Sequence, residues 1–170
     1  MSWAAMRELD AGSWFDARFA GARVPRLDET LARYGGRTHL ALEIKVPGIE
    51  EGVLEAIHRY GLLSRVTVTS FDWDTVCQVK RACPETRVGW LARDVSREAA
   101  ERAVTAGLNQ LCPPASAVTR ERVAAWKALG LEVRAWGVRD VGMMERAVEA
   151  GVDGMTVDFP HLLLEALGRK

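Results

Sequence analysis

The sequence has little that would mark a membrane, secreted or nucleic-acid-binding protein. No apolar run reaches the roughly 18 residues that a membrane-spanning helix needs. The N-terminus, MSWAAMRELD, lacks a basic region followed by an apolar core, so no signal peptide is visible. The 23 Lys and Arg residues balance the 23 Asp and Glu residues. Bulk charge therefore gives no reason to expect nucleic acid or an anionic membrane as a partner.

Cysteine and histidine are both scarce. Cys77, Cys83 and Cys112 are odd in number and lack the spacing of a metal site. We expect reduced, mostly buried thiols of a cytoplasmic protein. A catalytic cysteine stays open, although none of the histidines lies in a recognisable partner motif.

Helix-like and strand-like segments alternate along most of the chain. The helix-like segments begin after a side chain that can accept hydrogen bonds from free backbone N–H groups. They end in glycine, which adopts the left-handed cap conformation without strain. The predicted N-caps are Asp72, Ser96, Thr119 and Asp140, and the glycines are Gly61, Gly107, Gly130 and Gly151. This alternation predicts a parallel sheet built from right-handed crossovers.

The strand-like runs number about six. They are LALEIK, RVTVTSF, RVGWL, GLNQL, LEVRAWGV and DGMTVD. A closed (β/α) barrel needs eight strands and typically ~250 residues, whereas an open doubly wound sheet could use six, and the glycine pattern alone does not decide. Residues 1–38 read as a mixed arm with a short helix, a turn and a helix that starts near Pro25.

The run LALEIK carries two opposite charges on one face. Strand side chains alternate, so Glu43 and Lys45 point one way while Leu40, Leu42 and Ile44 point the other. A solvated sheet face, a structural ion pair or a functional site would each account for the charges. The residues alone leave the three readings open.

Six short motifs in a fixed order carry a family resemblance. They are LDAGSWF, VPRLDETL, LALEIK, VTSF, AWGVRD and GVDGMTVDFP. The ordered set resembles the glycerophosphodiester phosphodiesterase family over nearly the whole chain. The resemblance implies a TIM-type barrel and metal-dependent hydrolysis of glycerophosphodiesters to glycerol 3-phosphate and an alcohol.

The resemblance also implies a site. Glu43 would be one ligand of a divalent cation, Ca²⁺ or Mg²⁺, and Lys45 would neutralise the phosphate. Trp136 would form a wall for the glycerol group, and Ser70 would line the pocket at the end of its strand. Both charges of LALEIK would then face the barrel mouth. The chain departs from the family pattern after Trp136, where Gly137 and Arg139 stand.

The family's histidine pair and its other metal carboxylates have no counterpart in these residues. They lie on a His-Arg-Gly strand, a Glu-x-Asp strand and a His-Asp pair, and His39, His58 and His161 match none of them. The resemblance therefore implies an incomplete barrel over residues 39–170, with about six strands of eight. We expect weak or absent cation binding and an inactive isolated chain, since losing acid–base groups costs on the order of 10²–10⁴ in rate.

An incomplete barrel would leave two unpaired edge strands, which recruit partners. We expect a second copy of the chain, a complementing chain, or the N-terminal arm folded across the gap. The small-molecule partner would be a glycerophosphodiester or a phosphate. Two functions follow. The chain belongs to an active phosphodiesterase whose other strands come from a separate polypeptide or an upstream segment, or it is a non-catalytic relic that binds phosphate ligands or oligomerises.

Three structural roles complete the expectations. Trp14, Phe15 and Phe19 are predicted to pack the arm against the barrel. Asp158 is predicted to cap the last helix, and Arg134 to form an ion pair at the bottom of the barrel.

Overall fold

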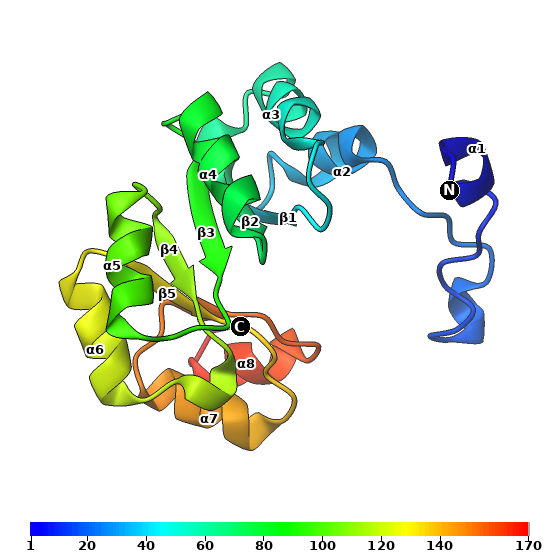
Figure 1. Cartoon of the computed structure of the whole chain (residues 1–170). Helices are drawn as coiled ribbons and strands as arrows, with labels where there is room; N and C mark the ends of the chain where they lie inside the picture. The colour runs from blue at the N-terminus through cyan, green and yellow to red at the C-terminus, as the bar shows by residue number, and fades with distance from the viewer. Residues whose placement is uncertain (170) are drawn as a thin grey trace.

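The chain forms one six-stranded parallel sheet in which every strand pairs with its neighbours in sequence (Figure 1). The computed structural model describes residues 1–169. The strand order is β1-β2-β3-β4-β5-β6. The strands are β1 (Leu40–Glu43), β2 (Val66–Ser70), β3 (Arg87–Leu91), β4 (Gln110–Cys112), β5 (Glu132–Ala135) and β6 (Gly154–Met155).

Helices connect the strands and cover the outside of the sheet. They are α1 (Trp3–Met6), α2 (Leu27–Tyr34), α3 (Glu50–Arg59), α4 (Trp73–Ala82), α5 (Arg97–Thr105), α6 (Arg120–Ala128), α7 (Val141–Glu149) and α8 (Pro160–Ala166). Three 3₁₀ segments, Ala17–Phe19, Leu63–Arg65 and Ala115–Ala117, lie between them. Within residues 1–169 no helix has both the length and the apolarity to cross a bilayer.

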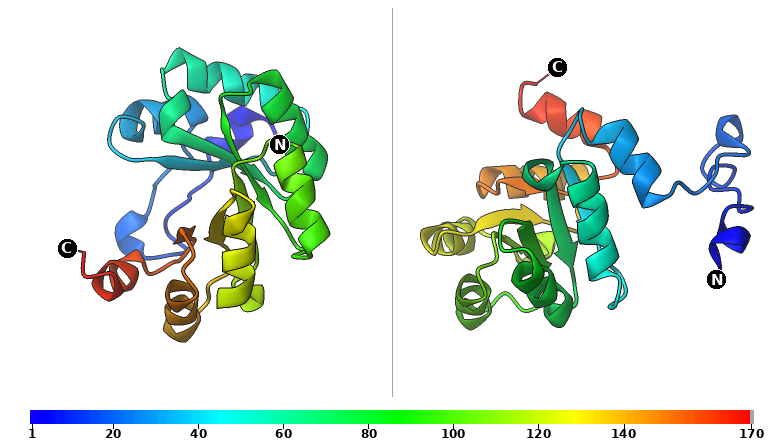
Figure 2. Two further views of the ribbon diagram at one scale, coloured as in Figure 1. Left: turned by 90° about the vertical axis from the view of Figure 1, so that its left-hand side faces the viewer. Right: turned by 90° about the horizontal axis from the view of Figure 1, so that it is seen from above.

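The sheet is curled (Figure 2), and it does not close within the described residues. In residues 1–169, β1 pairs only with β2, and β6 pairs only with β5. The predicted architecture, an incomplete (β/α) barrel with six strands, is confirmed. The strand predicted at GLNQL begins later than expected, at Gln110. The reason is that Gly107 ends α5 with a positive φ of 73°, and the chain needs a turn before β4 can start.

The helix boundaries follow the predicted caps. Asp72, Ser96, Thr119 and Asp140 each accept a hydrogen bond from a backbone N–H in the first turn of their helix. Gly61, Gly107, Gly130 and Gly151 all have positive φ. Asp158 does not cap α8, contrary to the prediction, because α8 begins one residue later and Phe159 occupies the N-cap position. Local cap chemistry thus sets most element ends.

The core lies between the outer face of the sheet and the helices. Alternate strand residues are fully buried there: Val66, Val68, Val88, Leu111 and Val133. Side chains of α3, α4 and α6 pack onto them, among them Ile57, Val76 and Trp126. Burying each such side chain stabilises the fold by about 1.5–3 kcal/mol.

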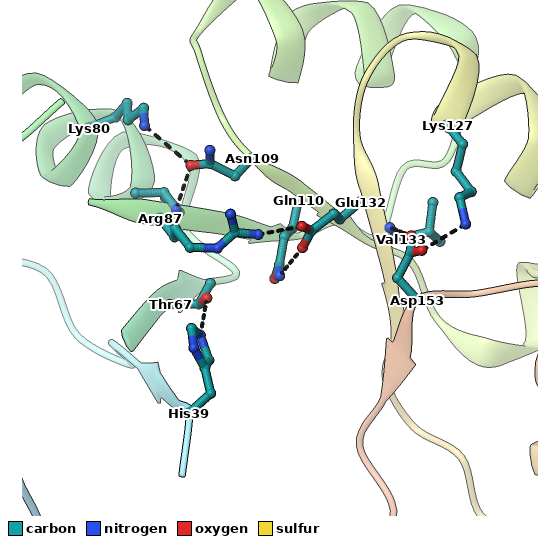
Figure 3. Close-up of polar contacts among 11 residues, drawn as sticks. His39, Thr67, Lys80, Arg87, Asn109, Gln110, Lys127, Glu132, Val133 and Asp153 are labelled. Carbon is teal, nitrogen blue, oxygen red and sulfur yellow. Dashed lines mark hydrogen bonds and ion pairs between the residues drawn. The ribbon is translucent and has the colours of Figure 1, made fainter. Parts of the chain in front are cut away.

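The inner face of the sheet carries a polar network instead (Figure 3). Arg87 forms an ion pair with Glu132, and the other Glu132 carboxylate oxygen accepts from Gln110 Nε2 at 2.8 Å. His39 Nε2 lies 2.8 Å from Thr67 Oγ1. Burial lowers the pKa of His39, and the positive charge of Arg87 adds to this effect. The inner face is therefore built for polar contacts.

The ion pair predicted for Arg134 is wrong. Arg87 pairs with Glu132 instead, while the aliphatic stem of Arg134 lies over Gly154 of β6. Among residues 1–169 the Arg134 guanidinium has no ion-pair partner. Gln110 of the same network keeps an unsatisfied acceptor. Its buried Oε1 has no hydrogen-bond donor in the described part of the chain.

The N-terminal arm stands off from the body of the molecule beyond α2 (Figures 1 and 2). It is organised by the Asp10 carboxylate, which accepts hydrogen bonds from the N–H groups of Gly12, Ser13 and Gly21 at 2.7–2.9 Å. These bonds, led by that of Ser13, hold the pKa of Asp10 well below its usual range. The arm therefore has its own local fold.

The arm aromatics do not pack against the barrel, contrary to the prediction. Trp14 is 82% exposed and Phe15 is 70% exposed. Their rings contact each other and Phe19 instead, with ring centroids 5.8 Å apart in both pairs. The Asp10-centred loop turns these rings toward solvent.

The Arg87–Glu132 ion pair on the inner face makes the free energy of unfolding depend on pH. Burial raises the pKa of Glu132, but hydrogen bonds from Gln110 and Arg87 outweigh it, so the pKa lies below the ordinary value of 4.5. A lowered carboxylate pKa stabilises the fold above 4.5, and this contribution is lost as pH falls through the folded-state value. Glu132→Gln should cost about 0.5–1 kcal/mol of unfolding free energy at pH 7, and this deficit should shrink below pH 4.5 in chemical denaturation.

Gln110→Met is the matched control, because it removes one donor and keeps the carboxylate. Its loss of stability with acid should be smaller than that of the native chain, because without the Gln110 hydrogen bond the folded-state pKa of Glu132 lies closer to its ordinary value of 4.5. A Glu132→Gln deficit that grows as pH falls would contradict the assignment.

Candidate functional site

Glu43 and Lys45 form an ion pair at the carboxyl end of the first strand. Glu43 is the last residue of β1, and Lys45 Nζ lies 2.9 Å from Glu43 Oε1. Between them, Ile44 is buried in the core and donates its N–H to Thr69 O. This backbone bond fixes the strand alternation beyond β1, so the two charges share the inner side of the sheet. The Lys45 side chain is 75% exposed and the Glu43 side chain 32%.

The pair opens into a small pocket of about 360 Å³. Parallel strands place their carboxyl ends on one edge, where (β/α) barrels keep their chemistry. The pocket is lined by Glu43, Ile44, Lys45, Ser70, Phe71, Asp72 and Arg93. A larger pocket of about 1050 Å³ lies outside the sheet, between α3 and α4. The smaller pocket is the candidate site, because it lies at the mouth and holds the predicted charges.

Ser70 lies in the wall of this pocket with its hydroxyl already engaged. Its Oγ donates to Ile44 O at 2.7 Å and accepts from Asp72 N at 3.1 Å. The residue is buried, with 2% exposed. Ser70 therefore ties the end of β1 to the end of β2 and holds the segment that carries Glu43 and Lys45.

Trp136 lies across the same mouth, after β5. Its indole N–H donates to Cys112 O at 2.9 Å, which fixes the ring and leaves only its apolar surface for contact. Phe71 meets the ring edge to face, with centroids 5.0 Å apart and an interplanar angle of 81°. The structure thus places Trp136 against Phe71, which lines the pocket, although Trp136 itself does not line it.

Sequence reasoning missed Arg93 and the part that Phe71 plays. The Arg93 guanidinium lies 4.5 Å from the centroid of the Phe71 ring. A signal existed in the sequence, because Arg93 is the second residue after RVGWL and so had to fall at the mouth. Lys45 and Arg93 give the pocket two cationic side chains.

The described residues do not form a metal site by themselves. Residues 1–169 contain no group of three or more His, Cys, Asp or Glu side chains that could hold a metal ion. Asp72 shares the pocket with Glu43, but its carboxylate caps α4 by accepting from Thr75 N at 2.8 Å. That bond lowers the pKa of Asp72. Glu43 would therefore be a single protein ligand, which does not fit a hard divalent cation.

The histidines lie away from the pocket. His39 precedes β1 and contacts Thr67 at the opposite end of the sheet. His58 lies in α3, where its Nδ1 is 2.8 Å from Leu54 O. His161 lies in the first turn of α8. None of the three lines the candidate pocket.

The Cys112 thiol lies on the inner side of the sheet, next to Gly89, and is buried. Burial raises its pKa to about 12. Cys77, Cys83 and Cys112 are all free thiols, and only Cys77 is partly accessible. A neutral buried thiol is a poor nucleophile, which leaves the carboxylate and the cations as the reactive groups of the mouth.

Comparisons with known proteins agree with this geometry. The family model described as the glycerophosphoryl diester phosphodiesterase family matches residues 1–162. A glycerophosphodiester phosphodiesterase of Caldanaerobacter subterraneus subsp. tengcongensis is 33% identical over 165 residues, which cover 94% of this chain and 68% of that protein.

Solved structures share the fold. The glycerophosphodiester phosphodiesterase of Agrobacterium tumefaciens superposes with a TM-score of 0.82 at 24% identity, over 97% of this chain and 71% of that one. An Oleispira antarctica phosphodiesterase in complex with the product sn-glycerol-3-phosphate gives a TM-score of 0.83 at 24% identity, over 99% and 71% of the two chains. On its sequence match and its fold, the chain belongs to the glycerophosphoryl diester phosphodiesterase family.

Proposed function

We propose that this chain supplies the phosphate-binding half of a glycerophosphodiester phosphodiesterase site. The Glu43–Lys45 pair at the carboxyl end of β1 is the observation that carries the proposal. Lys45 would neutralise the phosphoryl oxygens, and Glu43 would be one ligand of a divalent cation, Ca²⁺ or Mg²⁺. Trp136 would form the wall for the glycerol group. The structure of the Oleispira relative with sn-glycerol-3-phosphate supports a ligand of this class.

The remaining catalytic groups would come from strands that complete the barrel. The free edges of β1 and β6 each present backbone groups that another strand can pair with. Gln110 Oε1, buried on the inner face without a donor in residues 1–169, suits a donor side chain from such a strand. The completing segment would belong to a second polypeptide or to another part of the same protein. It would bring the acid–base pair and further carboxylates.

Activity should require both halves. The 170-residue chain alone should release no glycerol 3-phosphate from glycerophosphocholine with Mg²⁺ or Ca²⁺ beyond a Glu43→Ala control. Adding the segment of the Caldanaerobacter relative that this chain does not match should restore turnover. Glu43→Ala should then lower that turnover by at least about 10²-fold, because a metal carboxylate is lost.

Glu145→Ala on α7 is the matched control and should keep the complemented rate. Turnover by the isolated chain that depends on Glu43 would contradict the need for completing strands. Complemented turnover that is equal in the Glu43→Ala variant would remove Glu43 from the site.

A second candidate function is phosphate-ligand binding without turnover. The exposed Lys45 ammonium and the nearby Arg93 favour it, because both cations lie in the pocket of the isolated chain. This candidate differs from the first only in whether completing strands ever assemble. Turnover after complementation separates the two.

Both candidates require that Lys45 contacts the anion. Lys45→Met should weaken binding of sn-glycerol 3-phosphate to the full chain by about tenfold in isothermal titration calorimetry, as expected for one charged hydrogen bond. Arg81→Met, which removes the same charge from the last turn of α4, should leave the affinity within about twofold. Equal affinities for Lys45→Met and the native chain would place the anion elsewhere.

A further inference from the structure

Arg93 lies over the ring of Phe71. Its guanidinium lies 4.5 Å from the Phe71 ring centroid, and Phe71 in turn is fixed against Trp136. Arginine stacks on aromatic faces while its N–H donors stay free in the plane of the guanidinium. Stacking on Phe71 therefore limits the directions in which the Arg93 donors can point, and the side chain lines the pocket.

The donors of Arg93 are uncommitted among residues 1–169, where the guanidinium has no hydrogen bond or ion pair. Two acids near Arg93, one along the chain and one across the pocket, accept hydrogen bonds from other groups. Asp94 accepts from Ser96 N at 2.9 Å and Ser96 Oγ at 3.1 Å. Asp72 accepts from Thr75 N. Arg93 therefore presents a cation that has no ion-pair partner in the described residues, and free N–H groups, to whatever enters the mouth.

This arrangement has a consequence for cationic ligands. A quaternary ammonium group is recognised by open aromatic faces, which attract it through the ring quadrupole. At this mouth the face of Phe71 is already covered by a cation. An ammonium group would lose the aromatic face and would meet a like charge, which costs about 1 kcal/mol at 4 Å even in water.

We propose that Arg93 is a specificity-determining residue that selects against glycerophosphodiesters with a quaternary ammonium alcohol and for those with an uncharged polyol alcohol. Hydroxyl oxygens of a polyol can accept from the free guanidinium donors, whereas a trimethylammonium group offers no acceptor. This inference rests on the proposed function of the pocket, because it assigns the alcohol preference of that same site.

The test compares three ligands on the full chain by isothermal titration calorimetry. The probes are sn-glycerol 3-phosphate, glycerophosphoglycerol and glycerophosphocholine. The native chain should bind glycerophosphoglycerol about five- to tenfold more tightly than glycerophosphocholine. Arg93→Met, which keeps a long apolar stem over Phe71, should reduce this ratio to within about twofold. Arg93→Lys keeps the charge and should retain most of the preference, and Arg81→Met should retain all of it.

The outcomes separate the two claims. A ratio that is the same in Arg93→Met and the native chain, or a native preference for glycerophosphocholine, overturns the role of Arg93. Binding of sn-glycerol 3-phosphate without binding of either diester also overturns it, while the phosphate site stands. Loss of the preference in Arg93→Lys overturns the charge argument. Failure of all three ligands to bind overturns both this inference and the proposed function.

Discussion

The open curl of the parallel sheet is the constraint on which the other features depend. A parallel sheet is stable when both faces are covered, and a barrel meets this need by closing on itself. Here the outer face is covered by helices, but β1 and β6 are edges and the inner face is lined by polar side chains. The Arg87–Glu132–Gln110 network gives these side chains partners within the sheet. It explains how an incomplete wall tolerates an inner face that a closed barrel would shield.

The candidate site depends on the same geometry at the opposite end of the strands. The Ser70 hydroxyl joins β1 to β2, and Ile44 extends the ladder past Glu43. These two contacts aim a carboxylate and an ammonium at the mouth, although neither charged residue is itself held by the core. Edge strand β1 would otherwise fray, and the pair would lose its common direction.

Much of the fold could be predicted from the sequence because it is determined locally. Glycine at helix ends and Asp, Ser or Thr at helix starts act within a few residues, so strand and helix order followed from cap chemistry. The side of Glu43 and Lys45 followed from the two-residue repeat of a strand. The roles of Arg134, Asp158 and Trp14 could not be predicted in this way. Each role depends on which residue lies nearest in space. A shift of one residue in a helix start, or the path of a loop, decides that neighbour. The position of Arg93 after RVGWL placed it at the mouth, but only the fold brings it over Phe71.

The carboxylate of Asp10 makes the shape of the N-terminal loop independent of the sheet. Its donors all come from residues 12–21, so the loop is ordered before anything touches it. Ordering a flexible segment on association normally opposes binding by about 1–2 kcal/mol per residue of backbone. A surface that docks on Trp14 and Phe15 would avoid that penalty and meet a preformed pair of rings. The loop thus presents these rings in an arrangement that its own hydrogen bonds hold.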